Sequence, residues 1–218
     1  MTDSITQLHA RPIETSLESL LAPDSKEWKA ADESVVPLEP TPLDQQPSAY
    51  VQASWQERPR SQPGDLLVRA AAVDGGLAVR LDWAAPRPQR FISDVNVYPD
   101  ACAVVFPADG VETEFRTMGS SEHPVRAWQW RAGNDAPFVV TATGIGTVER
   151  VPEHEVQARA HWGDGRWQVV LTRSLAADGV PLARGSILPV AFAIWSGAAR
   201  ERAGIKSISQ PPCELRIG

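Results

Sequence analysis

Lys206 is the residue of this chain whose type and place in the sequence most invite chemistry. Only three of the 21 basic residues are lysines, and Lys206 is the only one after residue 29. It follows a short apolar run, residues 190–195, that predicts a buried strand and ends at Ser196-Gly197. An arginine keeps its proton in a protein, whereas a buried lysine can lose its proton and become a neutral ligand. The alternatives are an exposed loop lysine and a coding bias towards arginine.

Met118 is equally isolated, because it is the only methionine besides the initiator. It lies in the segment Phe115-Arg-Thr-Met-Gly-Ser-Ser121, just before the alternating run Val125–Arg131. A methionine most often fills gaps in a hydrophobic core, and that reading stays open here.

Two groups of motifs in this chain resemble a known family. The first is Ala191-Phe-Ala-Ile-Trp-Ser-Gly197 with Glu201-Arg202 and Lys206-Ser207, and the second is Thr117-Met-Gly119 with Pro124–Trp130. They are similar to the haem b gamma subunits of ethylbenzene dehydrogenase and related periplasmic molybdenum enzymes, which include steroid C25 dehydrogenase, dimethylsulfide dehydrogenase, and chlorate and selenate reductases. The resemblance extends from about Tyr50 to the C-terminus.

The resemblance implies one haem b whose iron is held by the Met118 thioether and the Lys206 amine. A six-coordinate iron suits electron transfer because it offers no open position to oxygen or substrate, and a thioether favours the ferrous state. Gly119 would let the backbone pass close to the macrocycle, and Trp128 and Trp130 would wall the pocket, although both tryptophans also suit an ordinary core. The candidates for pairing with the propionates are Arg126, Arg131, Arg200 and Arg202.

The histidines are weaker candidates for an iron ligand. His123, five residues after Met118, is the main rival, whereas the other three are expected on the surface: His9, His154 and His161. No spacing typical of a catalytic triad or a metal site stands out. We therefore expect no catalytic centre within this chain.

Alternation of apolar and polar residues predicts an all-β fold, an antiparallel β-sandwich spanning residues 49–218 and enclosing the haem. Two alternating runs joined by Gly163-Asp-Gly165 predict a β-hairpin. The predicted strands are 66–73, 77–83, 101–106, 125–131, 138–143, 156–162, 166–172, 190–195 and 213–217.

Residues 1–48 differ in composition from the remainder. The first 60 residues contain ten acidic and five basic residues, and prolines at positions 37, 40, 42 and 47 favour extended backbone. Apart from a short helical turn at 16–21, we expect an extended, acidic, Pro-rich arm that lies along a partner or along its own domain.

Composition limits the functional classes. A net charge of −6 and a pI near 5.3 argue against nucleic acid or an anionic membrane as partner, and no apolar run is long enough to span a bilayer. Two cysteines, Cys102 and Cys213, do not define a disulfide framework. Residues 1–9 do not look like a signal peptide, which alone indicates the cytoplasm.

The resemblance instead implies a periplasmic protein that is exported as a passenger with the catalytic subunit of a heterotrimer. The partners would be an iron–sulfur beta subunit and an alpha subunit with the molybdenum cofactor, with a soluble electron acceptor. The implied reaction of the complex is anaerobic C–H hydroxylation of a hydrocarbon or sterol side chain. The alternatives are a gamma subunit of an oxyanion reductase, a haem sensor, and a cofactor-free β-sandwich that binds carbohydrate through its tryptophans.

Overall fold

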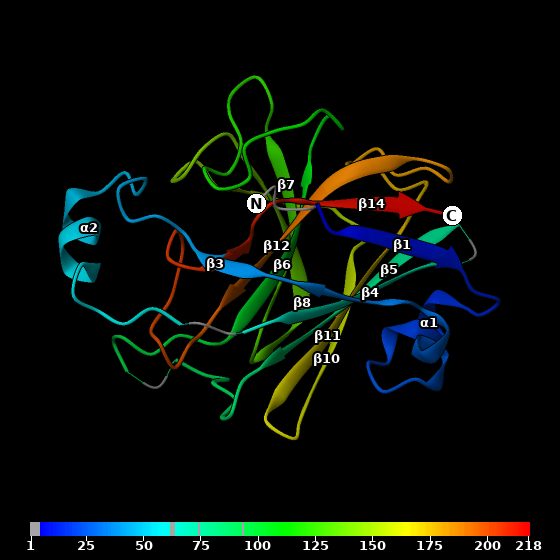
Figure 1. Ribbon diagram of the computed structural model, residues 1–218, viewed down its shortest axis with the longest axis horizontal. Coiled ribbons are helices and arrows are strands. Elements are labelled where there is room, and N and C mark those ends of the chain that lie inside the picture. Colours follow the sequence, from blue (N-terminus) through cyan, green and yellow to red (C-terminus); the bar gives the residue numbers. More distant parts are fainter. Residues whose placement is uncertain (1–4, 62–63, 74, 93) are drawn as a thin grey trace.

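The computed structural model describes residues 5–61, 64–73, 75–92 and 94–218. Figure 1 shows strands that cross in layers, with the short helices α1 and α2 at the periphery. In chain order the elements are β1 (Gln7–Pro12), α1 (Leu17–Leu21), the 3-10 helix η1 (Lys26–Ala30), β2 (Glu33–Val36), β3 (Leu38–Pro40), α2 (Ala49–Trp55), β4 (Leu66–Val73), β5 (Gly76–Ala84), β6 (Ala101–Pro107), β7 (Val125–Arg131), β8 (Asn134–Ala142), β9 (Glu149–Val151), β10 (Gln157–Gly163), β11 (Arg166–Ser174), β12 (Ile187–Trp195), β13 (Ser207–Ser209) and β14 (Cys213–Ile217).

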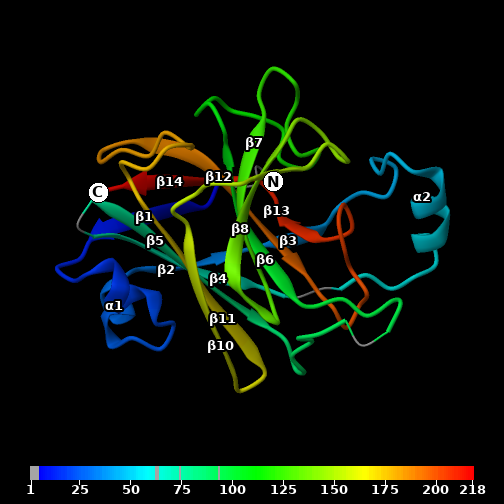
Figure 2. The same ribbon diagram turned by 180° about the vertical axis from the view of Figure 1, so that it is seen from behind.

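The strands form a β-sandwich, as predicted. One layer has the order β10-β11-β5-β4-β2 and the other the order β12-β6-β7-β8-β9, and every pairing within them is antiparallel. Strands β1 and β14 join the layers along one edge (Figures 1 and 2). There the pairing departs from the prediction, because β1 is parallel to both β4 and β14.

Every strand predicted from alternation overlaps an observed strand. The hairpin between β10 and β11 is tighter than predicted, since Gly163 pairs with Arg166 and only two residues form the turn. Those residues, Asp164 and Gly165, have φ angles of 51° and 74°. Positive φ at both positions is the conformation that matches the twist of the flanking strands.

Side chains alternate between two unlike faces in the layer that contains β6, β7 and β12. The inner face carries large side chains such as Phe106, Trp128 and Phe192, which pack against the opposite layer. The outer face carries small ones, among them Ala103 and Ala193. Because successive residues of a strand point to opposite sides, the main core and the outer surface of this layer are built independently.

The first 48 residues lie along the sandwich, which is one of the two places expected for them, and they add strands to its sheets. Strand β1 lies between β4 and β14, β2 pairs with β4, and β3 pairs with β13. Helices α1 and η1 cover one outer face, where Trp28 is buried and its Nε1 donates to Leu20 O at 2.9 Å. Buried apolar residues between the prolines hold this segment on the sandwich, and composition alone did not reveal them.

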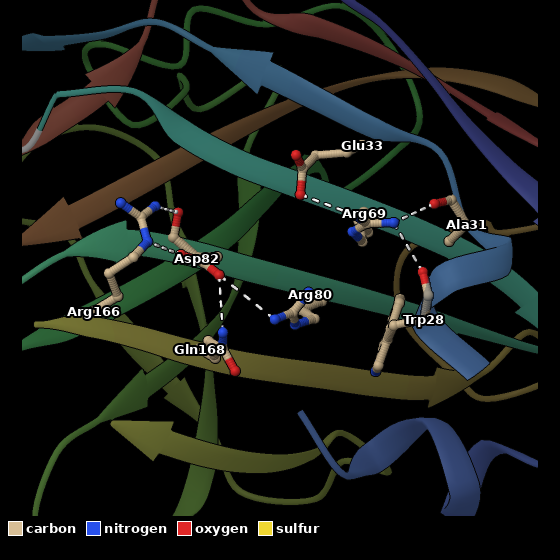
Figure 3. A network of polar contacts seen from close by, with 8 residues as sticks. All are labelled: Trp28, Ala31, Glu33, Arg69, Arg80, Asp82, Arg166 and Gln168. Atoms are coloured by element: carbon tan, nitrogen blue, oxygen red, sulfur yellow. Dashed lines mark hydrogen bonds and ion pairs between the residues drawn. The ribbon is translucent and has the colours of Figure 1, made fainter. Parts of the chain in front are cut away.

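The rest of that outer face carries a half-buried ionic network (Figure 3). Asp82 on β5 accepts from Arg80 at 3.5 Å, from Gln168 at 3.1 Å and from Arg166. Arg69 on β4 pairs with Glu33 at 3.1 Å. Each arginine in this network therefore lies beside a carboxylate.

The helices of the described residues are all short. Helix α2, which the sequence analysis missed, is seven residues long and carries the buried Trp55. A helix capable of crossing a bilayer is not found among the described residues.

Candidate functional site

Met118 lies in the loop between β6 and β7, on the outer face of its layer. Its side chain is 5% exposed and packs with Phe115 and the small side chains of β6 and β12. Backbone hydrogen bonds fix the loop: Met118 N donates to Phe115 O at 3.1 Å, and Gly119 N donates to Glu114 O at 2.8 Å. Met118 has a φ of 66°, in the left-handed region that non-glycine residues seldom occupy. The loop thus holds the thioether in one defined direction.

The structure gives another reason for glycine at position 119 than the predicted approach to a macrocycle. Its φ is 79°, and a Cβ atom there would lie 2.8 Å from His123 O and 2.9 Å from Val125 N. The close approach is therefore to the chain's own backbone, where Gly119 bridges to Pro124. Gly119 shapes the methionine loop and does not line the adjacent pocket.

Lys206 lies at the end of the turn that joins β12 to β13, and the N-terminal segment holds this turn in place. Thr41 N donates to Lys206 O at 2.9 Å, and Thr41 Oγ1 lies 2.7 Å from Gly204 O and 3.2 Å from Lys206 O. Gln46 Nε2 donates to Gly204 O at 3.1 Å. Glu201 ties the start of the turn to residue 61, since it accepts from Ser61 N at 2.8 Å.

The Lys206 amine and the Met118 thioether meet in the interior. Nζ lies 3.0 Å from Sδ and 5.5 Å from the centroid of the Trp195 ring. Lys206 is 2% exposed, and among the described residues no carboxylate forms an ion pair with it. Burial lowers the pKa of this amine to about 8. A thioether is a weak acceptor, so it does little to stabilise an ammonium ion.

A pocket of about 590 Å³ opens beside the two side chains. Met118, Lys206 and Trp195 lie along it with Tyr98 and Phe138, and α2 contributes Tyr50, Val51 and Trp55. A volume of this size suits a ligand that is largely enclosed by protein. The chain therefore places one amine and one thioether on a largely apolar cavity.

Arginines supply nearly all the charge of the pocket. Arg58, Arg131, Arg200 and Arg202 line it, whereas Glu201, the one acidic residue among its described lining residues, is buried and accepts from backbone donors. Arg202 also lies over the Tyr98 ring at 4.8 Å. Guanidinium groups in this number suit a ligand that carries carboxylates.

Sequence comparison relates this chain to known proteins. A protein of Haloferax mediterranei that is assigned as a respiratory nitrate reductase heme subunit is 33% identical over 206 residues, which are 92% of this chain and 72% of that protein. The chain belongs to the family of haem-carrying gamma subunits of molybdenum enzymes. The family model described as ethylbenzene dehydrogenase matches residues 143–207, which include β12 and Lys206.

Two further relatives are named as gamma subunits. The chlorate reductase subunit gamma of Ideonella dechloratans is 34% identical over 156 residues, covering 70% of this chain and 64% of that protein. The dimethylsulfide dehydrogenase subunit gamma of Rhodovulum sulfidophilum is 30% identical over 155 residues, covering 66% and 57%. The chain thus spans less than two thirds of the length of these two relatives.

Solved structures with a similar fold are carbohydrate-binding proteins. A protein of Bacteroides uniformis assigned to carbohydrate binding aligns with a TM-score of 0.56, 8% identity and coverage of 99% of this chain and 100% of its own. A family 9 carbohydrate-binding module of Caldicellulosiruptor kristjanssonii aligns with a TM-score of 0.51, 8% identity and coverage of 97% and 93%. At such low identity the likeness concerns the fold alone.

The residues of this gamma subunit fit a haem. A buried amine without a charged partner, a thioether facing it, and an apolar pocket with guanidinium groups match the donor set and the periphery of such a group. Among the described residues, no cluster of three or more His, Cys, Asp or Glu side chains is arranged to hold a metal ion.

Trp128 and Trp130 do not line the pocket of the gamma subunit, which corrects the sequence prediction. Both point to the inner face of β7 and pack in the main core, whereas Gln129 and Arg131 point outwards to the pocket. A strand that presents residue 129 to one side must turn 128 and 130 to the other. The aromatic residues that line the pocket are instead Tyr50, Trp55, Tyr98, Phe138 and Trp195, and only Trp195 lay in a motif that could have indicated it.

The other residues considered in the sequence divide into those that line the pocket and those that lie elsewhere. Arg131, Arg200 and Arg202 line the pocket, whereas Arg126 does not. His123 Nδ1 lies 3.1 Å from Asp109 Oδ2 and is not among the pocket residues, and the remaining histidines are exposed. Cys102 and Cys213 are free and buried.

Proposed function

We propose that this gamma subunit is an electron-transfer protein that binds one haem b between Met118 and Lys206. The observation that carries the proposal is that Lys206 Nζ and Met118 Sδ face each other at 3.0 Å in a buried site and have no other polar partner among the described residues. The two side chains must move apart to bind a metal between them. A bound haem supplies a one-electron couple. With Met118 and Lys206 both holding it, a bound iron would have no open position, which suits transfer of electrons and not binding of substrate.

The residues around the pair have separate tasks. Burial favours the neutral amine of Lys206, the form that has a lone pair to donate. The Met118 thioether favours the reduced metal. Arg131, Arg200 and Arg202 are placed to pair with the propionates, and Trp195 and Phe138 exclude water from the ring.

We place the chain in a heterotrimer with an iron–sulfur beta subunit and a molybdenum-containing alpha subunit, in the periplasm and exported with the catalytic subunit. The proposed overall reaction is anaerobic C–H hydroxylation of a hydrocarbon or sterol side chain, with electrons leaving through this subunit to a soluble acceptor. The match of residues 143–207 to the ethylbenzene dehydrogenase model supports membership of the gamma-subunit family, and the direction of electron flow is part of this proposal. Substrate choice lies in the alpha subunit.

An oxyanion reductase is the second candidate for the complex. The names of two relatives, a chlorate reductase gamma subunit and a nitrate reductase heme subunit, favour it. Electrons would then enter through this subunit and flow towards molybdenum. Assays of the purified complex with ethylbenzene and an electron acceptor, and with chlorate and a reduced donor, distinguish the two directions.

Visible absorption spectroscopy tests the ligand proposal. Met118→Ala and Lys206→Ala should each lose haem or lose the six-coordinate spectrum, and Lys206→Arg should do the same because a guanidinium has no lone pair to give. Lys29→Ala, at an exposed lysine, is the matched control and should bind haem normally. Retention of an unchanged spectrum by Lys206→Ala would remove the lysine from the coordination sphere. A folded, colourless wild-type preparation that binds oligosaccharide would favour the carbohydrate-binding alternative.

A further inference from the structure

Arg126 lies away from the haem pocket, at the opposite end of β7. Its strand neighbours are Phe106 and Thr141, and like Trp128 it belongs to the inner face. Among the described residues its guanidinium forms no ion pair, and its Nε atom is buried without a hydrogen-bond partner. The Nε atoms of Arg69, Arg80 and Arg116 are in the same state, but each of those arginines has a carboxylate beside it and Arg126 has none among the described residues.

Arg173 approaches the same point from the other layer. It is the next-to-last residue of β11, is 3% exposed, and lies 5.3 Å from the centroid of the Trp128 ring. Its Nη2 donates to Val180 O at 2.7 Å and its Nε to Ser174 O at 3.1 Å. Nη1 of Arg173 donates to no atom of the described residues, so it can donate a hydrogen bond to a bound group.

Gly179 shows how closely the two guanidinium groups converge. A Cβ atom placed on Gly179 would lie 2.5 Å from Nη1 of Arg126 and 3.3 Å from Nη1 of Arg173. Two cations so close in a partly dehydrated place repel one another, because an arginine keeps its charge. Asp178 and Glu155 are the acidic residues nearby, both are exposed, and neither forms an ion pair with either arginine.

The network of Figure 3 provides a comparison within the same molecule. There Arg80 is also half-buried, but Asp82 lies 3.5 Å from it, and Arg69 has Glu33. The fold therefore supplies a carboxylate to each of these two half-buried arginines. The pair formed by Arg126 and Arg173 lacks this internal compensation.

We propose that Arg126, Arg173 and Gly179 form a binding site for a small oxyanion, separate from the haem pocket. An anion with two or more oxygens on one centre can accept from both Nη1 atoms at once, which a monatomic halide cannot do as well. A side chain at position 179 would collide with the Arg126 guanidinium, so Gly179 allows the two arginines to approach the same point. The site takes sulfate, phosphate or a carboxylate, and it is independent of the proposed electron-transfer function.

Thermal unfolding of the full chain in sodium sulfate, and in sodium chloride of equal ionic strength, tests this site. We expect sulfate to raise the wild-type midpoint by about 2–4 °C more than it raises that of Arg126→Met, with an effect that grows with the logarithm of sulfate concentration. The comparison with the variant removes the general stabilising effect of sulfate. Sodium acetate serves as a second probe, for carboxylates.

Arg80→Met is the matched control, because it removes a half-buried arginine that has an internal partner. It should lower the midpoint in chloride and keep the full sulfate response. Arg126→Met should leave the midpoint in chloride unchanged or raise it, since the repulsion from Arg173 disappears. Titration of ¹⁵N-labelled arginine signals should show the Nε resonances of residues 126 and 173 moving together on addition of sulfate.

Two results would overturn the proposal. One is an equal sulfate response in wild type and Arg126→Met, which would mean that the ion does not bind at this pair. The other is a loss of the sulfate-specific difference together with strong destabilisation of Glu155→Gln or Asp178→Asn in chloride, which would mean that a carboxylate of the chain already compensates the two arginines.

Discussion

The sulfur of Met118 lies 3.0 Å from the amine of Lys206, although 88 residues separate them in the sequence. Each comes from a loop on the outer face of the same layer, one between β6 and β7 and the other between β12 and β13. Because β12 and β6 are antiparallel, the loop after β6 and the loop after β12 leave from opposite ends of the pair. The contact therefore depends on both loops folding over the outer face of the layer.

The haem-free protein should become more stable as the pH rises from about 8 to the lysine's ordinary value. Burial lowers the pKa of Lys206 to about 8 from 10.5, so in this range the unfolded chain binds a proton that the folded chain does not. Below pH 8 the folded chain bears the full cost of burying the charged amine, which lowers the free energy of unfolding by about 3 kcal/mol. Urea unfolding of wild type and Lys206→Met at several pH values measures it.

Lys206→Met removes this titration. We expect the variant to exceed the wild type in stability at pH 7 and to show little dependence on pH between 8 and 10.5. Parallel stability curves for the two proteins would mean that the lysine is solvated in the haem-free state.

Gly119→Ala should destabilise the chain strongly and disturb the methionine loop. The new Cβ would combine a positive φ with contacts of 2.8 and 2.9 Å to backbone atoms, so we expect a loss of about 2–4 kcal/mol. Gly64→Ala is the matched control, because Gly64 also has a positive φ of 70° but no atom of the described part of the chain lies within 4 Å of the added Cβ. Gly64→Ala should lower stability by only about 1–2 kcal/mol, the cost of the backbone conformation alone. Equal losses would show that the backbone beside Gly119 moves freely.

Thr41→Val should weaken the turn that presents Lys206. The substitution keeps the shape and removes the hydroxyl that lies 2.7 Å from Gly204 O. Gln46 still donates to that carbonyl, so we expect a loss of only about 1 kcal/mol in stability. Haem dissociation should become faster, because the ligand is less firmly positioned.

A serine at position 41 keeps the hydroxyl and should restore slow dissociation. Ser186→Ala serves as the control, since it removes a hydroxyl bonded to Ala183 O at 2.6 Å at the other end of β12. If both variants released haem at the wild-type rate, Thr41 would have no part in holding the lysine.

Trp195→Phe and Trp130→Phe should affect different properties. Trp195 lines the pocket, and its Nε1 donates to Ala203 O at 3.0 Å in the lysine turn, so its replacement should shift the haem spectrum or the reduction potential. Trp130 packs against Trp167 in the main core at 4.9 Å between ring centroids, so its replacement should lower stability by about 1–3 kcal/mol and leave the spectrum unchanged. Spectra and urea unfolding of both variants decide the matter, and a spectral shift in Trp130→Phe alone would reverse the assignment.

The sequence by itself determined the fold class and the identity of the two unusual side chains. Alternation along β5, β7 and β11 marks strands because it depends only on which residues are apolar, and a lone lysine or methionine is visible without coordinates. The same local signal could not show which face of β7 meets the pocket, so Trp128 and Trp130 were assigned to the wrong side.

Only the tertiary structure showed what the N-terminal segment contacts and why residue 119 is a glycine. Thr41 contacts residues 204–206 through hydrogen bonds that join distant parts of the chain, and Gly119 is required by the backbone at residues 123–125. The approach of Arg126 and Arg173 to the same point likewise depends on two layers meeting at one end of the sandwich. Such contacts between segments are set by packing, which leaves no local pattern in the sequence.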